Sequence, residues 1–339
     1  MYINFLLIMA HRGRLAAPRA ILAQGVGVNP PLILHQLEVS RKTIHLTITA
    51  NDETCLKWLA EKGLVSNTMN CHRCQIPMAL INKQELSDGK TWRCRECSTE
   101  TTIRSGSFFE GSHLSLTTLV ELLYWWTTEA MQKVVMRELD IAAQTIVDWF
   151  SFIREVCWLW VEDNAEQIGG IDPVIEQPKI VEIDESLFFQ RKYHRGRNRG
   201  HHWVFGGIER GTARCFLQVV QQRDANTLLP IIQQWILPNT VIMSDLWRAY
   251  GGIPNLPEGY QHLPTNHSLN FVDPNDQTIH TNTCEGMWSN VKHKFRIMNG
   301  TSEENFSDYL AEFIWRKKFK ENVFGHLLAC IREHYPVYD

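Results

Sequence analysis

The chain has 339 residues, enough for two or three domains that each bury a core of their own. Its hydrophobic content of 44% and charged content of 21% are those of an ordinary globular protein. A formal net charge of −3 excludes a uniformly basic protein, so any attraction to DNA must come from local clusters of Lys and Arg. Nine sparsely spread cysteines exclude a disulfide scaffold, and no apolar run approaches the ~18 residues of a membrane helix.

Composition and periodicity along the chain predict five segments. Residues 1–50 lack sustained periodicity and are expected to form a poorly ordered extension. Residues 51–110 are expected to hold a short helix and a zinc ribbon, and residues 111–168 a helical segment. Residues 176–320 are expected to form an α/β domain, and residues 321–339 a C-terminal helix and tail.

Two Cys-x2-Cys pairs predict a structural zinc site. Cys71 and Cys74 form one pair and Cys94 and Cys97 the other, with nineteen residues between the pairs. Each pair offers two thiolates from one turn, and two turns complete the tetrahedral shell that Zn²⁺ prefers. The alternative is a chance grouping of core cysteines. The other five cysteines have no such spacing and are expected to be core or incidental residues.

The segment after the zinc ribbon has helical periodicity. Apolar residues recur at helical spacing from Leu116 to Trp126, and a longer helical run follows a break at Asp140-Ile141. A short helix, a tight turn and a longer helix are the outline of a helix-turn-helix, which would bind DNA. The alternative is a helical linker that packs on the next domain.

From Lys179 the pattern changes to strands alternating with helices. A polar, histidine-containing stretch before Thr283 is expected to be a loop. Three antiparallel strands followed by alternating helices and strands predict a mixed-sheet α/β domain. The expected strands are Lys179–Phe189, His202–Glu209, Arg214–Gln221 and Thr240–Ser244, and the expected helices are Ala225–Ile236, one from Thr283 past Phe295, and Glu304–Phe319.

Two aspartates follow strongly β-forming runs. Asp184 is expected to end the run that starts at Ile180, and Asp245 the run that starts at Val241. Carboxylates at neighbouring strand ends repel each other by several kcal/mol at close range, and a divalent cation between them converts that repulsion into binding. Their hard oxygen ligands suit Mg²⁺ or Mn²⁺.

Glu285, 40 positions after Asp245, is a candidate third acid. The alternative is a helix cap, since Asn282-x-x-Glu285 fits a capping box. On a helical wheel, however, Glu285 shares a stripe with Lys292 and Arg296, beside the apolar stripe, which suits a metal ligand flanked by phosphate contacts. His262, His267 and His280 are expected to be surface residues. A basic hairpin that would lie along a phosphate backbone consists of Arg191, Lys192, Arg195, Arg197 and Arg199.

Several motifs, in this order, resemble the transposases of Merlin elements and their bacterial insertion-sequence relatives, the ISXO2-like group. The resemblance covers about residues 52–319 and includes the zinc ribbon. Its motifs are Val181-Glu182-Ile183-Asp184-Glu185-Ser186, Arg191-Lys192-Tyr193-His194-Arg195-Gly196-Arg197, Trp203-Val204-Phe205-Gly206-Gly207-Ile208-Glu209-Arg210, Asn266-His267-Ser268, Phe271-Val272-Asp273-Pro274 and His280-Thr281-Asn282-Thr283-x-Glu285-x-x-Trp288.

The resemblance implies a DDE transposase with an RNase H-like, mixed five-stranded sheet and flanking helices. It assigns Asp184, Asp245 and Glu285 as the three acids that hold Mg²⁺, and Lys292 as a basic residue of the same site. The implied partners are double-stranded DNA, as element terminal inverted repeats and target DNA, and further copies of the chain on that DNA. The implied location is the nucleus, or the cytoplasm if the source is bacterial.

Two other functions remain open from the sequence. One is a domesticated, non-catalytic DNA-binding protein derived from a transposase, because retained acids do not demonstrate activity. The other is a zinc-ribbon nuclease unconnected with transposition, which would not require specific inverted-repeat ends.

Overall fold

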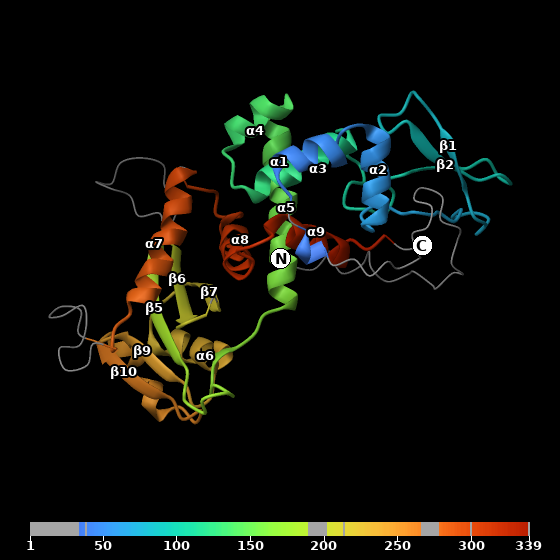
Figure 1. Ribbon diagram of the computed structural model, residues 1–339. Helices are drawn as coiled ribbons and strands as arrows, with labels where there is room; N and C mark the ends of the chain where they lie inside the picture. Colours follow the sequence, from blue (N-terminus) through green and yellow to red (C-terminus); the bar gives the residue numbers. More distant parts are fainter. Residues whose placement is uncertain are drawn as a thin grey trace. The chain divides into compact units, whose positions relative to one another are not determined.

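The computed structural model divides into two compact units, one within Met1–Val156 together with Glu321–Asp339 and the other Cys157–Lys320. Figure 1 labels their helices and strands. Among the described residues, no helix combines the length and the apolar character that crossing a membrane requires. The structure describes residues 34–37, 39–188, 202–212, 214–265, 278–298 and 300–337.

The first unit combines a small antiparallel sheet, in the order β1-β2-β3, with short helices. Helix α5 (Ala143–Asp163) begins in this unit and ends in the second. The unit's other elements are η1 (Leu34–Gln36), α1 (Arg41–Thr43), η2 (Ile44–Ile48), α2 (Asp52–Glu61), β1 (Ala79–Asn82), β2 (Lys90–Arg93), β3 (Glu100–Thr102), α3 (Leu116–Thr127), α4 (Gln132–Leu139) and α9 (Val323–His334).

Residues 34–48 differ from the extension predicted for residues 1–50. They form η1, α1 and η2, and Leu34, Ile44 and Ile48 are buried. η1 packs against α9, where Gly325 permits the close approach because a Cβ there would collide with the Leu34 carbonyl oxygen. The partner of η1 comes from the opposite end of the chain, so local periodicity carried no sign of it, whereas η2 packs against α2 and α3. Residues 1–33 lie outside the described residues.

The second unit is built on a five-stranded mixed sheet in the order β10-β9-β5-β6-β7. Its central strand β5 (Ile180–Phe188) pairs antiparallel with β6 (His202–Glu209) and parallel with β9 (Val241–Asp245). β7 (Cys215–Val220) and β10 (Gln261–Thr265) are the edges. The remaining elements are β4 (Ile168–Gly169), α6 (Ala225–Trp235), β8 (Ile236–Leu237), η4 (Arg248–Asn255), α7 (Asn282–Ile297) and α8 (Phe306–Lys318).

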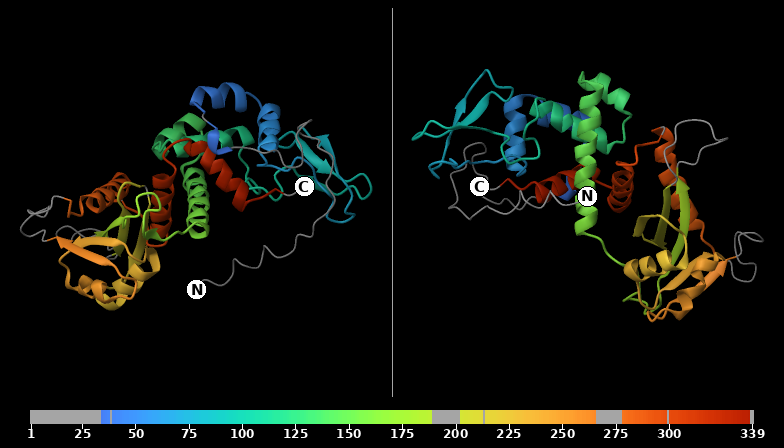
Figure 2. Two further views of the ribbon diagram at one scale, coloured as in Figure 1. Left: turned by 60° about the horizontal axis from the view of Figure 1, so that its bottom comes forward. Right: turned by 180° about the vertical axis from the view of Figure 1, so that it is seen from behind.

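The two faces of this sheet carry separate cores because side chains of a strand alternate between faces. Val181 and Ile183 of β5 pack with α6 and η4. Phe188 of β5 packs with Trp288 and Phe295 of α7 and with the start of α8. In Figures 1 and 2, α7 accordingly lies along β5 and β6 on the face opposite α6. The even-numbered residues of β5 therefore face α7.

The predicted mixed α/β architecture with a five-stranded sheet is confirmed. Helices also form over most of the segment predicted to be helical, as α3, α4 and α5. The polar stretch predicted to be a loop differs, because η4 and β10 form within it. β10 pairs in parallel with β9 over its whole length, and this pairing compensates for a sequence, Gln261–Thr265, with weak strand character of its own.

Candidate active site and zinc site

Asp184 and Asp245 lie on the same face of adjacent parallel strands. β5 and β9 pair in register from Ile180 opposite Val241 to Glu182 opposite Met243. The same register continued by two residues sets Asp184 opposite Asp245, and neighbouring strands are about 4.8 Å apart. Both aspartates therefore lie near the end of the sheet where β9 stops, on the side that α7 covers.

The two aspartates differ in how their strands end. Asp245 is the last residue of β9, as predicted, and its Oδ1 accepts a hydrogen bond from the Trp247 amide at 2.9 Å. Asp184 does not end β5, because β5 continues along β6 to Phe188. Its pairing with β9 nevertheless stops at Glu182, so on the β9 side Asp184 lies beyond the last paired residue.

Glu285 lies on α7, close enough for its charge to raise the pKa of Asp184. It is the fourth residue of the helix, whose N-cap is Thr281, so Asn282 is not the cap residue that a capping box would need. Two turns further on, Lys292 lies with its Nζ 5.5 Å from the centre of the Phe188 ring. Arg296, one turn beyond Lys292, is exposed. The predicted helix therefore forms and packs on β5, and Glu285, Lys292 and Arg296 lie along one stripe of it.

The pKa of Asp184 reflects the negative charges of nearby acids. Burial raises the pKa of Asp184 to about 7, and the negative charges of Glu185, Asp245 and Glu285 add to the rise. Burial lowers the pKa of Lys292, the Asp184 charge opposes that shift, and Arg296 adds to it. The acids and Lys292 therefore share one electrostatic environment. Among the described residues, however, only the zinc-site cysteines have ligand atoms that all lie within 4.8 Å of one another, so the three acids are spaced more widely.

The buried Asp184 carboxylate makes the folding stability depend on pH when no Mg²⁺ or Mn²⁺ is present. The folded-state pKa of Asp184, about 7, exceeds its ordinary value of 3.8, so the folded state holds the proton more tightly than the unfolded state. The associated stability is present at low pH and lost as the pH rises towards about 7. We expect Asp184→Asn to raise the free energy of unfolding by about 2–4 kcal/mol at about pH 8, with no gain below about pH 4.

Chemical unfolding of the zinc-loaded protein across this pH range, without added divalent cation, measures the difference. A gain that stays the same at both ends of the range would contradict the assignment of that pKa to Asp184.

Helix α7 approaches the sheet closely beside Asp184. Gly206 of β6 pairs with Asp184, and a Cβ at Gly206 would come within 2.8 Å of the Trp288 ring. The glycine leaves the space that Trp288 needs to lie against the strand, next to the aspartate. Gly207 serves the other face, where a Cβ would collide with Phe216. The Gly-Gly pair of the motif therefore has a packing reason on each face.

Two acids of the same strand were not assigned roles by the sequence. Burial raises the pKa of Glu185 to about 7, and the charge of Asp245 contributes to the rise. Glu182 is completely buried and shares its face of β5 with Asp184. The signal for Glu182 was its place two residues before Asp184, since side chains two apart on a strand share a face. Nothing in the sequence indicated what Glu182 contacts.

The remaining predicted residues divide between described and undescribed parts of the chain. His262 does not lie in a loop but in β10, where it is half-buried and its Nε2 lies 2.8 Å from Ser244 Oγ. His280 lies just before α7, beside Arg210. The basic hairpin (Arg191, Lys192, Arg195, Arg197 and Arg199) and His267 lie outside the described residues.

The four predicted zinc ligands converge in the first unit. One ligand atom from each of Cys71, Cys74, Cys94 and Cys97 lies within 4.8 Å of the others. The two turns that carry them have the same backbone hydrogen bond: the Cys71 amide donates to the Ile76 carbonyl and the Cys94 amide to the Thr99 carbonyl, at 2.9 Å each. Hydrogen bonds from Thr99 lower the pKa of Cys97 to about 6, which favours the metal-binding thiolate. The donor set and its spacing fit a structural Zn²⁺.

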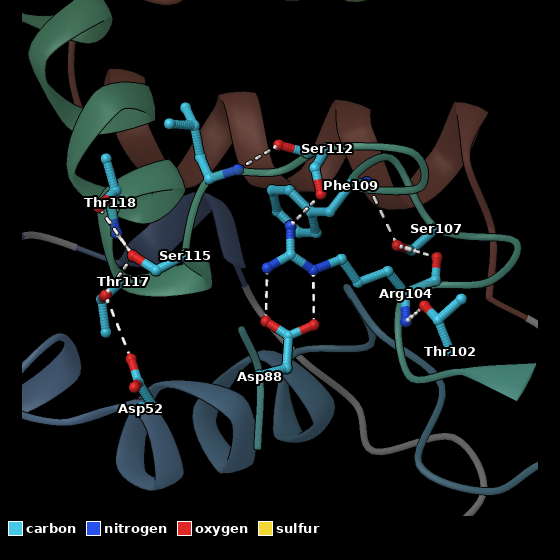
Figure 3. A network of polar contacts seen from close by, with 11 residues as sticks. Asp52, Asp88, Thr102, Arg104, Ser107, Phe109, Ser112, Ser115, Thr117 and Thr118 are labelled. Carbon is cyan, nitrogen blue, oxygen red and sulfur yellow. Dashed lines mark hydrogen bonds and ion pairs between the residues drawn. The ribbon is translucent and has the colours of Figure 1, made fainter. Parts of the chain in front are cut away.

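A buried ion pair joins the loops around this ribbon. Arg104 follows β3 and binds Asp88, from the β1–β2 loop, through two hydrogen bonds, the Nε bond measuring 2.7 Å. Its Nη1 donates to the Ser112 carbonyl at 3.1 Å, just before α3 (Figure 3). Both side chains of the pair are nearly inaccessible to solvent. The pair therefore joins the β1–β2 loop to the chain after β3, at the end of the sheet opposite the cysteine pairs.

Comparison with known proteins places the second unit in a family. The chain is 29% identical over 103 residues to an uncharacterized transposase-like protein of Haemophilus influenzae, a match that covers 30% of this chain and 80% of that protein. It is 22% identical over 303 residues to the male abnormal protein mab-31 of Caenorhabditis elegans, covering 82% of this chain and 67% of that protein. No solved structure matched the chain. Residues 179–318 match the model of the ISXO2-like transposase domain, and this segment of the chain belongs to that family.

Proposed function

We propose that the protein is a DDE transposase that cleaves DNA at element ends and joins the ends to target DNA. The observation that carries the proposal is the shared face of Asp184 and Asp245, next to Glu285 of α7, within a domain of a transposase family. The antiparallel β5, β6 and β7, followed by the parallel β9 and β10, support an RNase H-like fold. The helices α3 to α5 support a helix-turn-helix that recognises the ends, together with the ribbon.

The donor set fits a divalent cation. Asp184 carries a raised pKa because it is buried among negative charges, and such a group gains most from a cation with hard oxygen preferences. When bound by Asp184, Asp245 and Glu285, Mg²⁺ or Mn²⁺ would supply activation of a water or DNA 3′-hydroxyl and charge stabilisation during in-line displacement. The three acids hold the cation, and Lys292 and Arg296 bind phosphate beside it.

The test is DNA cleavage by the purified protein. Supercoiled DNA with Mn²⁺ reports cleavage of any kind, and a fragment carrying candidate terminal inverted repeats reports excision. Release of the fragment supports a transposase. Cleavage without dependence on the repeats would instead support a nuclease, and binding without cleavage a domesticated protein.

The second candidate is a DNA-binding protein derived from a transposase. The relative from Caenorhabditis elegans supports this second candidate. The name of that relative refers to a male abnormality and not to transposition, and its match to this chain extends well beyond the transposase domain. Under this alternative, the zinc ribbon and helices would still bind DNA, and substitution of the acids would have no effect on binding.

Lys292 offers a test of the phosphate contact. We expect Lys292→Ala to weaken DNA binding and to reduce the slope of log K against log salt by about 0.9, because one phosphate contact and its released counterion are lost. Lys318→Ala, which removes an exposed lysine at the end of α8, is the matched control. Fluorescence anisotropy at several salt concentrations measures both slopes, and equal slopes for the two variants would refute the contact.

A further inference from the structure

The start of α7 is bound to β5 by a buried carboxylate. Glu182 has no exposed surface, and its Oε2 accepts a hydrogen bond from the Cys284 amide at 2.8 Å. Its Oε1 accepts from Thr283 Oγ1 at 2.8 Å and from Arg210 Nε at 2.5 Å. A buried carboxylate is costly unless it is paired and hydrogen-bonded, and these three donors meet that requirement.

This contact caps the helix from a distant part of the chain. The N-cap residue of α7, Thr281, makes no side-chain capping hydrogen bond, yet the first amides of a helix need acceptors from outside it. Glu182 supplies an acceptor, and a negative charge at the positive end of the helix, from 102 positions earlier in the chain. The first turn of α7 is therefore held by Glu182 of β5 in addition to the local bond from the Asn282 amide to His280 Nδ1 at 3.4 Å.

Arg210 extends the same contact to the segment before α7. Its guanidinium donates to the Thr278 carbonyl at 2.6 Å and to the His280 carbonyl at 2.7 Å. Its own backbone amide donates to the Ile180 carbonyl, in the first residue of β5, at 2.9 Å. Arg210 thus connects the beginning of β5, through Glu182, to the chain that enters α7.

The proposed ligands lie immediately beyond both ends of this contact. Asp184 follows Glu182 by two residues on the same face of β5, about 7 Å along the strand. Glu285 is the residue directly after Cys284. A displacement of the helix start relative to β5 would therefore change the separation of the two acids. We propose that Glu182 is a positioning residue: by binding the start of α7, it holds Glu285 close to Asp184 for cation binding. This inference rests on the proposed function.

The experiment compares Glu182→Gln with Glu209→Gln. Glu209 is a matched control, because it is equally buried and accepts from the Gly169 amide at 2.7 Å, beside Lys179 and Arg214, on a part of the sheet that does not hold α7. Hydrogen exchange of the zinc-loaded protein without Mg²⁺ or Mn²⁺ is the first measurement. We expect the amides of Cys284 and Glu285 to exchange at least about tenfold faster in Glu182→Gln and at the parent rate in Glu209→Gln.

The second measurement is the Mn²⁺ concentration that gives half-maximal DNA cleavage. We expect a rise of about 10- to 100-fold in Glu182→Gln, the usual effect of losing a group that orients a ligand, and no change in Glu209→Gln. Thr283→Val removes one donor to Glu182 while Arg210 still pairs with the buried carboxylate, and it should speed the exchange of the Cys284 amide about fivefold even if Glu182→Gln does not fold.

Equal exchange at the start of α7 in all three variants and the parent would overturn the positioning role. A rise in exchange with no change in Mn²⁺ dependence would overturn its link to the acids. A parent protein that binds DNA but never cleaves it would overturn the proposed function, while the exchange data would still decide whether Glu182 holds α7.

Discussion

Replacing Asp184 or Asp245 by Asn is expected to lower metal-dependent DNA cleavage at least about 10³-fold, a loss of about 4 kcal/mol of transition-state stabilisation. Each substitution keeps the size of the side chain but removes a charge that a divalent cation requires at the proposed site. DNA binding should stay close to that of the parent, because the ribbon, the helices and the basic residues are unchanged. Single-turnover cleavage and binding to one labelled fragment measure the two properties separately.

The control for this prediction is another aspartate of the same unit. Asp224 caps α6, where its Oδ1 accepts a hydrogen bond from the Thr227 amide at 2.9 Å. Asp224→Asn should change stability by less than about 1 kcal/mol, since Asn is also a good cap, and should leave cleavage intact. The expected stabilisation by Asp184→Asn at about pH 8 separates loss of chemistry from loss of fold. Cleavage at the parent rate by either Asp184→Asn or Asp245→Asn would refute the DDE assignment.

Removing one zinc ligand is expected to unfold the ribbon. Cys74→Ser should abolish zinc binding and expose residues 70–109 to proteases, because the three strands of the ribbon have only three or four residues each. Sheets this small do not stabilise themselves, and a structural Zn²⁺ contributes about 10 kcal/mol or more to folding. Zinc content by mass spectrometry and limited proteolysis of the purified protein measure the effect.

Cys215→Ser is the matched control, since Cys215 is a half-buried cysteine of β7 outside the zinc group. It should keep the zinc of the parent and the same protease pattern. Cys74→Ser protein that retains stoichiometric zinc and an intact ribbon would contradict a four-cysteine site. The transposase domain, which is a separate compact unit, should keep its own unfolding transition in either variant.

Most elements of the second unit were predictable because their patterns are local. Runs of β-branched, aromatic and other apolar residues indicated β5 and β6, and a run of four apolar or small residues before Asp245 indicated β9. β10 was not predictable, because Gln261–Thr265 contains polar residues and Pro264 and becomes a strand only by pairing with β9. The packing of α9 against η1 was equally hidden, since it joins residues nearly 300 positions apart.

The sequence by itself determined the chemistry available to this protein. Cysteine spacing predicts the zinc ligands, and strand and helix periods predict which side chains share a face. Together with the family resemblance, these patterns named Asp184, Asp245, Glu285 and Lys292 before their positions were known. Only the tertiary structure decided which faces meet. The bond from Glu182 to the start of α7 is such a case: hydrogen bonds between residues about 100 positions apart follow from the packing of a whole sheet and helix, and local periodicity carries no record of them.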